Sequence, residues 1–141
     1  MKRYEYLPHT ADTKFRAYGK NLEEAFANSA LAMMNVMVEV EKVKALTTKK
    51  ISVEGTDLQS LLYNFLEQFL ILMDSKNLFL TTIKELKISK KAKEYKLAAT
   101  VAGDDAGKYE TIGPQVKAIT YNGMKIAQKE NNCTIQAIVD I

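Results

Sequence analysis

The chain has 141 residues, of which 47% are hydrophobic and 26% are charged, as is typical of one globular domain with a sizeable core. Its net charge of +3 is too small to indicate nucleic-acid binding by itself, and no apolar run approaches the roughly 18 residues that a membrane span needs. Met1, Lys2 and Arg3 are not followed by an apolar segment of the kind found in secretory signals. The lone Cys133 excludes an internal disulfide. These features predict a single cytoplasmic domain over residues 1–141.

The N-terminal segment predicts two short strands, at residues 4–6 and 14–18, where side chains alternate with a period of two. Between them stands the sequence His-Thr-Ala-Asp at residues 9–12. An Asp side chain in a turn commonly accepts backbone N–H groups, so a structural turn is the first interpretation of His9 and Asp12. A ligand or contact site is the second interpretation, and catalysis is the third.

Two amphipathic helices are predicted next. Asn21 is a good N-cap with Glu24 three residues later, and Asp57 begins the second helix. Both apolar stripes are wide enough to predict that each helix packs against a sheet. The stripes consist of Leu22, Ala25, Phe26, Ala30, Met33, Met34 and Met37 in the first helix, and of Leu58, Leu61, Leu62, Phe65, Leu66, Phe69, Leu70 and Met73 in the second.

The other segments alternate with a period of two and predict strands. One strand lies at residues 51–54, between the helices. A long hairpin is expected around Lys90 and Lys91, followed by strands joined through turns at Asn122-Gly123 and Asn131-Asn132. The predicted ranges after the second helix are 78–89, 94–102, 115–121, 124–128 and 133–139.

This order of elements predicts an α+β fold of two layers. The two helices are expected to pack on one side of a mostly antiparallel sheet of roughly six or more strands. Several lysines surround the long hairpin, and they are interpreted as a solvated edge that resists aggregation. A phosphate-binding patch is the alternative interpretation.

The last residues carry a second candidate site. The chain stops on Val139-Asp140-Ile141, and a C-terminal strand can pair with an N-terminal segment. If it does, Asp12, Asp140 and the terminal carboxylate converge, and such a cluster needs a cation, a shared proton or a basic partner. Carboxylate ligands suit Ca²⁺, Mg²⁺ or Mn²⁺ rather than zinc. The positive charge of Lys14 is expected to lower the affinity for a cation.

Several motifs, in order and from end to end of the chain, resemble the archease family. They are His-Thr-Ala-Asp at 9–12, Asn-Leu-Glu-Glu-Ala-Phe at 21–26, Asp57 with Leu61-Leu62, Val-Lys-Ala-Ile-Thr-Tyr at 116–121, and the closing Asp140-Ile141. The resemblance implies an archease-like fold and a non-enzymatic accessory protein of the RtcB-type RNA ligase. That ligase joins RNA ends carrying a 2′,3′-cyclic phosphate or 3′-phosphate to a 5′-hydroxyl, as in tRNA splicing. The accessory protein promotes its guanylylation and multiple turnover.

The resemblance also implies roles for particular residues. Asp12, Asp140 and the carboxylate of Ile141 form a divalent-cation site, with Ca²⁺ as the first choice and Mg²⁺ or Mn²⁺ as alternatives. Lys117 and His9 are implied as contacts with the partner. Two other functions stay open: a chaperone-like modulator of a tRNA methyltransferase, and a small metal-dependent hydrolase. Weak or no direct nucleic-acid binding is expected, because no aromatic-plus-glycine RNA motif interleaves with the lysines.

Overall fold

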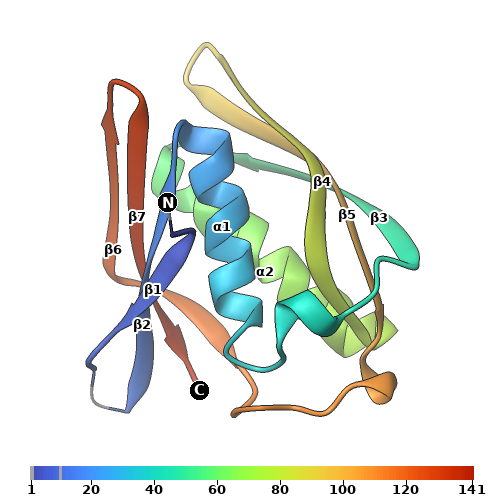
Figure 1. Ribbon diagram of the computed structural model, residues 1–141. Helices are drawn as coiled ribbons and strands as arrows, with labels where there is room; N and C mark the ends of the chain where they lie inside the picture. Colours follow the sequence, from blue (N-terminus) through green and yellow to red (C-terminus); the bar gives the residue numbers. More distant parts are fainter. Residues whose placement is uncertain (1, 10) are drawn as a thin grey trace.

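The structure, a computed structural model, describes residues 2–9 and 11–141 (Figure 1). Within the described residues, no helix is long and apolar enough to cross a membrane. The elements in chain order are β1 (Tyr4–Leu7), β2 (Asp12–Gly19), α1 (Leu22–Met34), the 3₁₀ turn η1 (Val40–Lys42), β3 (Thr47–Gly55), α2 (Leu58–Lys76), β4 (Leu78–Lys91), β5 (Glu94–Asp105), the 3₁₀ turn η2 (Ala106–Lys108), β6 (Ala118–Lys129) and β7 (Asn132–Asp140).

The strands form two antiparallel sheets rather than the single sheet that was predicted. One sheet has the order β1-β2-β7-β6 and the other has the order β3-β5-β4. The α+β class, with two helices against antiparallel strands, is confirmed. The strands divide because the β6–β7 hairpin pairs with β2, whereas the β4–β5 hairpin pairs with β3.

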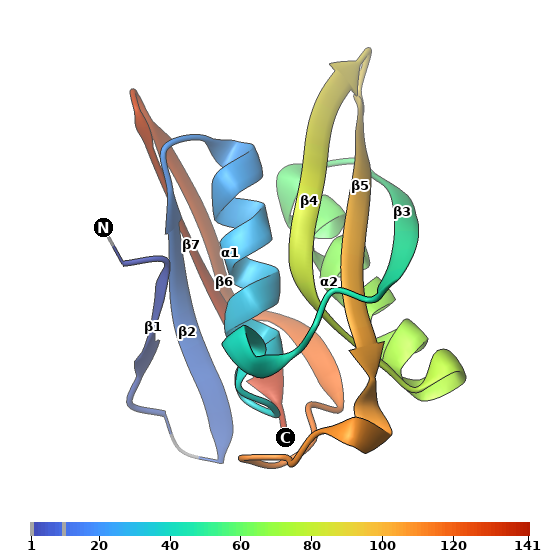
Figure 2. The same ribbon diagram turned by 45° about the vertical axis from the view of Figure 1, so that its right-hand side comes forward.

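Both helices lie between the two sheets, instead of on one side of one sheet (Figure 2). Helix α1 contacts β2 and β7 on one side and β4 on the other, and α2 contacts β6 as well as β3. In α1, nine residues between Ala25 and Met34 are buried, including polar Asn28 and Ser29. A helix buried on almost all of its faces needs a layer on each side, which explains the second sheet.

The two helices begin in the same way. The side chain of Asn21 accepts the N–H of Glu24 at 2.9 Å, and that of Asp57 accepts the N–H of Ser60 at 2.7 Å. Two residues before each cap stands a glycine, Gly19 or Gly55, at the end of a strand. A Cβ at either glycine would lie about 2.5 Å or less from a backbone nitrogen of the following helix. Both strand-to-helix connections therefore depend on close backbone contact that only glycine permits.

The predicted turn at Asn122-Gly123 is wrong, because β6 runs through it. Both halves of β6 pair with β7, and the register shifts between Thr120 and Lys125. Gly123 has a φ of 73°, and its carbonyl accepts a hydrogen bond from the side chain of Gln136 at 3.0 Å. Gly123 thus adopts the left-handed backbone that glycine favours, but the Asn-Gly pair lies in a β-bulge rather than in a hairpin turn.

The ends of some elements also differ from the prediction by a few residues. Helix α1 ends at Met34, although Met37 in the following turn is still buried. Strand β6 begins at Ala118 rather than at residue 115, and the β4–β5 hairpin turns at residues 92–93, beyond Lys91. In that turn Ala92 has a φ of 57°. Helix and strand ends are the least reliable part of a prediction from sequence.

The predicted apolar stripes form the core. The Phe65 ring is fully buried, with its centroid 6.2 Å from that of Phe26 and 5.1 Å from that of Phe69. Phe65→Ala should lower the free energy of unfolding by about 3–5 kcal/mol, since it removes a large side chain from a packed site. Ile71→Ala on the same helix is the control, because Ile71 is 45% exposed and should cost less than about 1 kcal/mol. Urea denaturation measures both, and equal losses would contradict this packing.

Asp104 is a buried carboxylate at the end of β5. It accepts hydrogen bonds from the hydroxyl of Tyr109 at 2.7 Å, from the N–H of Asp105 at 2.8 Å and from Nζ of Lys108 at 3.2 Å. Chiefly through the Tyr109 hydroxyl, these bonds hold the pKa of Asp104 below its usual value. A carboxyl group whose pKa is lower in the folded state stabilises the fold above its unfolded pKa and loses this contribution on acidification.

Tyr109→Phe should therefore destabilise the protein most at neutral pH. The difference in unfolding free energy between the wild type and the variant should narrow below about pH 4, as Asp104 becomes protonated in both. Urea denaturation at neutral pH and at about pH 3 measures the two differences. A difference that is constant over this range would show that the Tyr109 hydroxyl does not act through the Asp104 charge.

Candidate functional site

The second strand of the chain pairs with the last one. Strand β2 pairs antiparallel with β7, and in this register Asp12 lies directly opposite Asp140. The prediction that the N-terminal segment and the C-terminal strand are neighbours is thus confirmed. Residues directly opposite in an antiparallel pair lie about 4.5–5.5 Å apart at Cα and project from the same face. Two carboxylates are therefore side by side at the end of this sheet.

Alternation along the strands decides which face they use. In β2, Phe15 and Ala17 are fully buried, and in β7 Ile135, Ala137 and Val139 are fully buried, so the odd positions face the helices. The even positions, Asp12 and Asp140 among them, project from the other face of the sheet. Asp140 is exposed and Asp12 is partly exposed. The carboxylates are accessible from outside the molecule.

His9 lies beside this pair. Its Nδ1 is 3.8 Å from Oδ2 of Asp12, and the two side chains are 32% and 35% exposed. This distance is too long for a hydrogen bond but short enough for an ionic contact when the imidazole is protonated. Ala11, just before Asp12, has a φ of 69°, and Thr10 lies outside the described residues. The turn therefore places His9 at the same end of the sheet as Asp12.

The third strand at this point is β6. Ala118 lies opposite Asp140 on the side away from Asp12, and the N–H of Lys117 donates to the carbonyl oxygen of Asp140 at 2.7 Å. Lys117 and Ala118 are exposed, whereas Val116 is buried. The backbone of an exposed lysine thus lies next to Asp140.

The chain end follows immediately. Ile141 comes directly after Asp140, and its side chain is partly buried against the core. This packing holds Ile141 near the sheet, in the same region as Asp140. The structure thus brings four of the predicted residues to one edge: Asp12, Asp140, Ile141 and His9. The backbone N–H of Lys117 is hydrogen-bonded to Asp140, so Lys117 lies at the same edge.

The oxygen atoms gathered here are ligands of the type that a hard divalent cation prefers, but the side chains supply too few of them. Among residues 2–9 and 11–141, no group of three or more His, Cys, Asp or Glu side chains is placed to hold a metal ion. Asp12 and Asp140 supply two carboxylates, and oxygen donors of this kind suit Ca²⁺ or Mg²⁺. A third protein ligand would have to come from the main-chain carboxylate of Ile141 or from a partner.

Lys14 lies near the acidic pair. It faces Ile138, two paired positions along the ladder from Asp12 and Asp140, and projects from the same face. Positions two residues apart on one strand lie about 6.7 Å apart. At this spacing an ammonium group can act electrostatically on a cation, and the expectation that Lys14 lowers the affinity for one stays a prediction.

Tyr121 is a residue to which the sequence assigned no role. It lies in the β6 bulge, 53% exposed, and its ring stacks on that of Tyr63 in α2 with centroids 4.6 Å apart and planes 12° apart. Burial against this neighbour raises the pKa of Tyr121. The stack fastens the bulge to α2, and no local sequence signal could have predicted a contact between such distant positions.

The fold and this edge together define a small α+β domain with an exposed pair of carboxylates at its chain end. The sequence model of the Archease protein family (MTH1598/TM1083) matches residues 4–141. This chain belongs to the archease family.

Individual relatives agree with this assignment. The protein archease of Pyrococcus abyssi is 48% identical over 128 residues, which cover 89% of each chain. That of Methanosarcina barkeri is 37% identical over 144 residues, which cover 99% of this chain and 97% of the relative. The solution structure of Methanobacterium thermoautotrophicum protein 1598 covers 100% of both chains with a TM-score of 0.85 and 33% identity.

The acidic pair generates a prediction about stability. Without a cation, Asp140→Asn should raise the free energy of unfolding by roughly 0.5 kcal/mol, because like charges directly opposite in a sheet repel. The same variant should lose any stabilisation that added Ca²⁺ or Mg²⁺ gives the wild type. Thermal unfolding with a chelator and with each cation measures both effects.

Glu130→Gln is the control, since Glu130 is an exposed carboxylate in the β6–β7 turn and should change neither quantity. A second comparison uses a short tail after Ile141, which converts the terminal carboxylate into a neutral peptide. Weaker cation binding by the extended protein would identify the chain end as a ligand. Equal affinities would show that it is not one.

Proposed function

We propose that this protein is a non-enzymatic accessory factor that activates an RtcB-type RNA ligase in the cytoplasm. It would promote guanylylation and repeated turnover of the ligase in tRNA splicing or RNA repair. Membership of the archease family supports the proposal at the level of the protein class. The observation that carries it in the structure is the register that sets Asp12 opposite Asp140 on an accessible sheet face.

The carboxylates of Asp12, Asp140 and Ile141 would hold a divalent cation, with Ca²⁺ as the first choice and Mg²⁺ or Mn²⁺ as alternatives. When bound, such an ion supplies positive charge for the phosphates of a nucleotide. The exposure of Asp140 suits a site that a partner protein completes, since an open edge leaves coordination positions accessible. His9 borders Asp12 and adds a donor that a partner's carboxylate or phosphate could accept.

Lys117 would act at the contact with the ligase. Its backbone is fixed by the hydrogen bond to Asp140, whereas its side chain is exposed. A fixed backbone and a free ammonium group suit recognition of an acidic or phosphate group on a partner. The lysine would thereby orient the partner relative to the acidic pair.

The direct test measures guanylylation of a purified RtcB-type ligase with GTP at limiting metal, with and without this protein. The wild type should increase the guanylylated fraction and allow several ligation turnovers per enzyme. Asp12→Asn and Asp140→Asn should reduce this effect most at the lowest metal concentration. Ligation of broken tRNA by this protein in the absence of the ligase would instead identify an enzyme, and would contradict the proposal.

Lys117→Ala should weaken activation at least several-fold and leave the melting temperature nearly unchanged, because an exposed side chain contributes little to stability. Lys125→Ala is the matched control, since Lys125 is an exposed lysine on the same strand β6. Activation by the Lys117 variant equal to that by the Lys125 variant would assign Lys117 the role of an ordinary surface lysine.

A further inference from the structure

A groove of about 510 Å³ opens at the end of the molecule away from the acidic pair. Its lining includes Cys133, which lies opposite Gly19 at one end of the β2–β7 ladder, whereas Asp12 and Asp140 lie at the other end. The ladder has eight paired positions, so the two ends are about 23 Å apart. The groove is therefore a separate site from the one described above.

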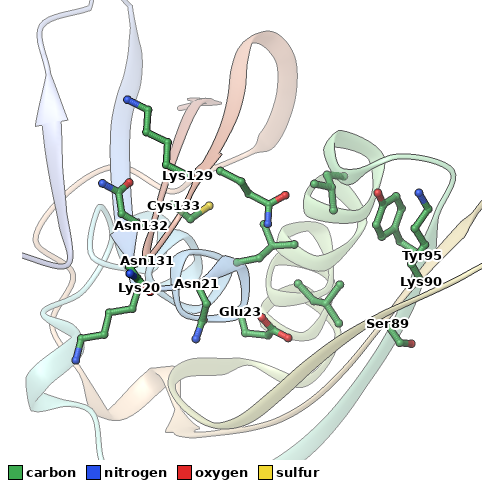
Figure 3. Close-up of a pocket in the computed structure, with 14 residues that line it drawn as sticks. Lys20, Asn21, Glu23, Ser89, Lys90, Tyr95, Lys129, Asn131, Asn132 and Cys133 are labelled. Atoms are coloured by element: carbon green, nitrogen blue, oxygen red, sulfur yellow. The ribbon is translucent and has the colours of Figure 1, made fainter.

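Four separate parts of the chain line this groove, with Leu58 at the start of α2 as the contribution of one of them. Lys20 and Asn21 precede α1, Lys129 lies at the end of β6, and Lys90 and Tyr95 lie in the β4–β5 hairpin. In Figure 3, Lys20, Lys129, Asn131 and Asn132 lie on one side, with Ser89, Lys90 and Tyr95 on the other. An extended ligand lying between the β4–β5 and β6–β7 hairpins would contact the residues on both sides of the groove.

The groove carries positive charge. Lys20, Lys90 and Lys129 line it, with Glu23 as the carboxylate among the lining residues. Within residues 2–9 and 11–141, none of these three lysines forms an ion pair. Ammonium groups without partners around a concave surface attract an anionic ligand.

The start of α1 adds to this attraction. Asn21, Leu22 and Glu23 line the groove, and the first-turn N–H groups of a helix have no acceptor within the helix. The Asn21 cap is neutral and accepts the N–H of Glu24, although the carboxylates of Glu23 and Glu24 in this first turn reduce the attraction. Backbone donors at such a position bind phosphate oxygens, as they do at other helix N-termini.

Two further features distinguish a nucleic acid from an acidic peptide. Nζ of Lys90 lies 5.3 Å from the centroid of the Tyr95 ring, which places an aromatic surface beside a positive charge. Gln128, Asn131 and Asn132 add amide groups that can both donate to and accept from base edges. A peptide carboxylate needs neither the ring nor the paired amide donors and acceptors, whereas a nucleotide uses both.

We propose that this groove binds a short single-stranded nucleic-acid segment. The phosphates contact Lys20, Lys90 and Lys129, and one base stacks at Tyr95 while the amide side chains meet base edges. A cavity of this volume suits about one or two nucleotides. With few phosphate contacts the binding is weak and strongly dependent on salt. The groove would hold an RNA strand while Asp12 and Asp140, at the opposite end, contact a protein partner. This binding site is additional to the ligase contact proposed above.

The test uses fluorescence anisotropy of a labelled oligouridine with the full-length protein. Three phosphate contacts predict a slope of about −2 for log affinity against log salt, so a fourfold rise in salt should weaken binding about 20-fold. Reversal of all three groove lysines (K20E, K90E, K129E) should reduce the affinity at least about tenfold. The matched control reverses three exposed lysines outside the groove (K44E, K50E, K76E) and changes the net charge equally.

Tyr95→Leu tests stacking without a change of charge, and it should weaken oligouridine binding about fivefold or more. Circular dichroism confirms that each variant is folded. The absence of binding by the wild type at low salt, or an equal loss in the control variant, would overturn the proposal. Displacement of the oligouridine by polyglutamate, together with full binding by Tyr95→Leu, would also overturn it and identify an acidic protein segment as the ligand. No ligase is present, so the outcome is independent of the guanylylation test.

Discussion

The β2–β7 pairing is the constraint on which the remainder of this structure depends. It joins residues near the two ends of the sequence through eight consecutive positions, from Asp12 opposite Asp140 to Gly19 opposite Cys133. Without it, the β6–β7 hairpin would have no sheet to join, and α1 would be covered on one side only. Because α1 is buried on nearly all of its faces, it requires this sheet as well as the sheet formed by β3, β5 and β4. The topology thus follows from the burial of one helix.

The two ends of the β2–β7 ladder also differ in charge. The carboxylates of Asp12 and Asp140 meet at one end, where β2 begins and β7 stops. At the other end, β2 leads into the N-terminus of α1, and β7 begins at the hairpin that carries Lys129. Antiparallel pairing makes this arrangement unavoidable, since the start of one strand must face the end of its neighbour. The net charge of +3 does not reveal this difference, because it adds the negative charges at one end to the positive charges at the other.

The surroundings of a carboxylate in this protein determine whether it stabilises the fold or is available to a ligand. Asp104 is 3% exposed and accepts hydrogen bonds from a hydroxyl, a backbone N–H and an ammonium group. Its charge is fully compensated, and its role is to hold η2 and the following loop against β5. Asp12 and Asp140 instead face each other on an accessible surface. Like charges opposite each other repel, and in the proposed function a cation or a basic partner relieves that repulsion.

The sequence by itself determined the local elements. The caps at Asn21 and Asp57 and the helical spacing of apolar residues predicted both helices, because these signals act within a few residues. Alternation predicted the strands, and the expected pairing of the C-terminal strand with the N-terminal segment placed Asp140 near Asp12. Only the tertiary structure decided that Asn122-Gly123 forms a bulge, since this depends on both halves of β6 pairing with one strand.

Tertiary structure also decided the division into two sheets and the gathering of Lys20, Lys90 and Lys129 around one groove. The three lysines belong to segments far apart in the sequence, so no spacing or motif relates them. Local signals specify which face of an element is apolar, but they do not specify which distant element covers that face. Packing between elements makes that choice, and it is the packing of both sheets against two buried helices that brings the hairpins and the start of α1 together.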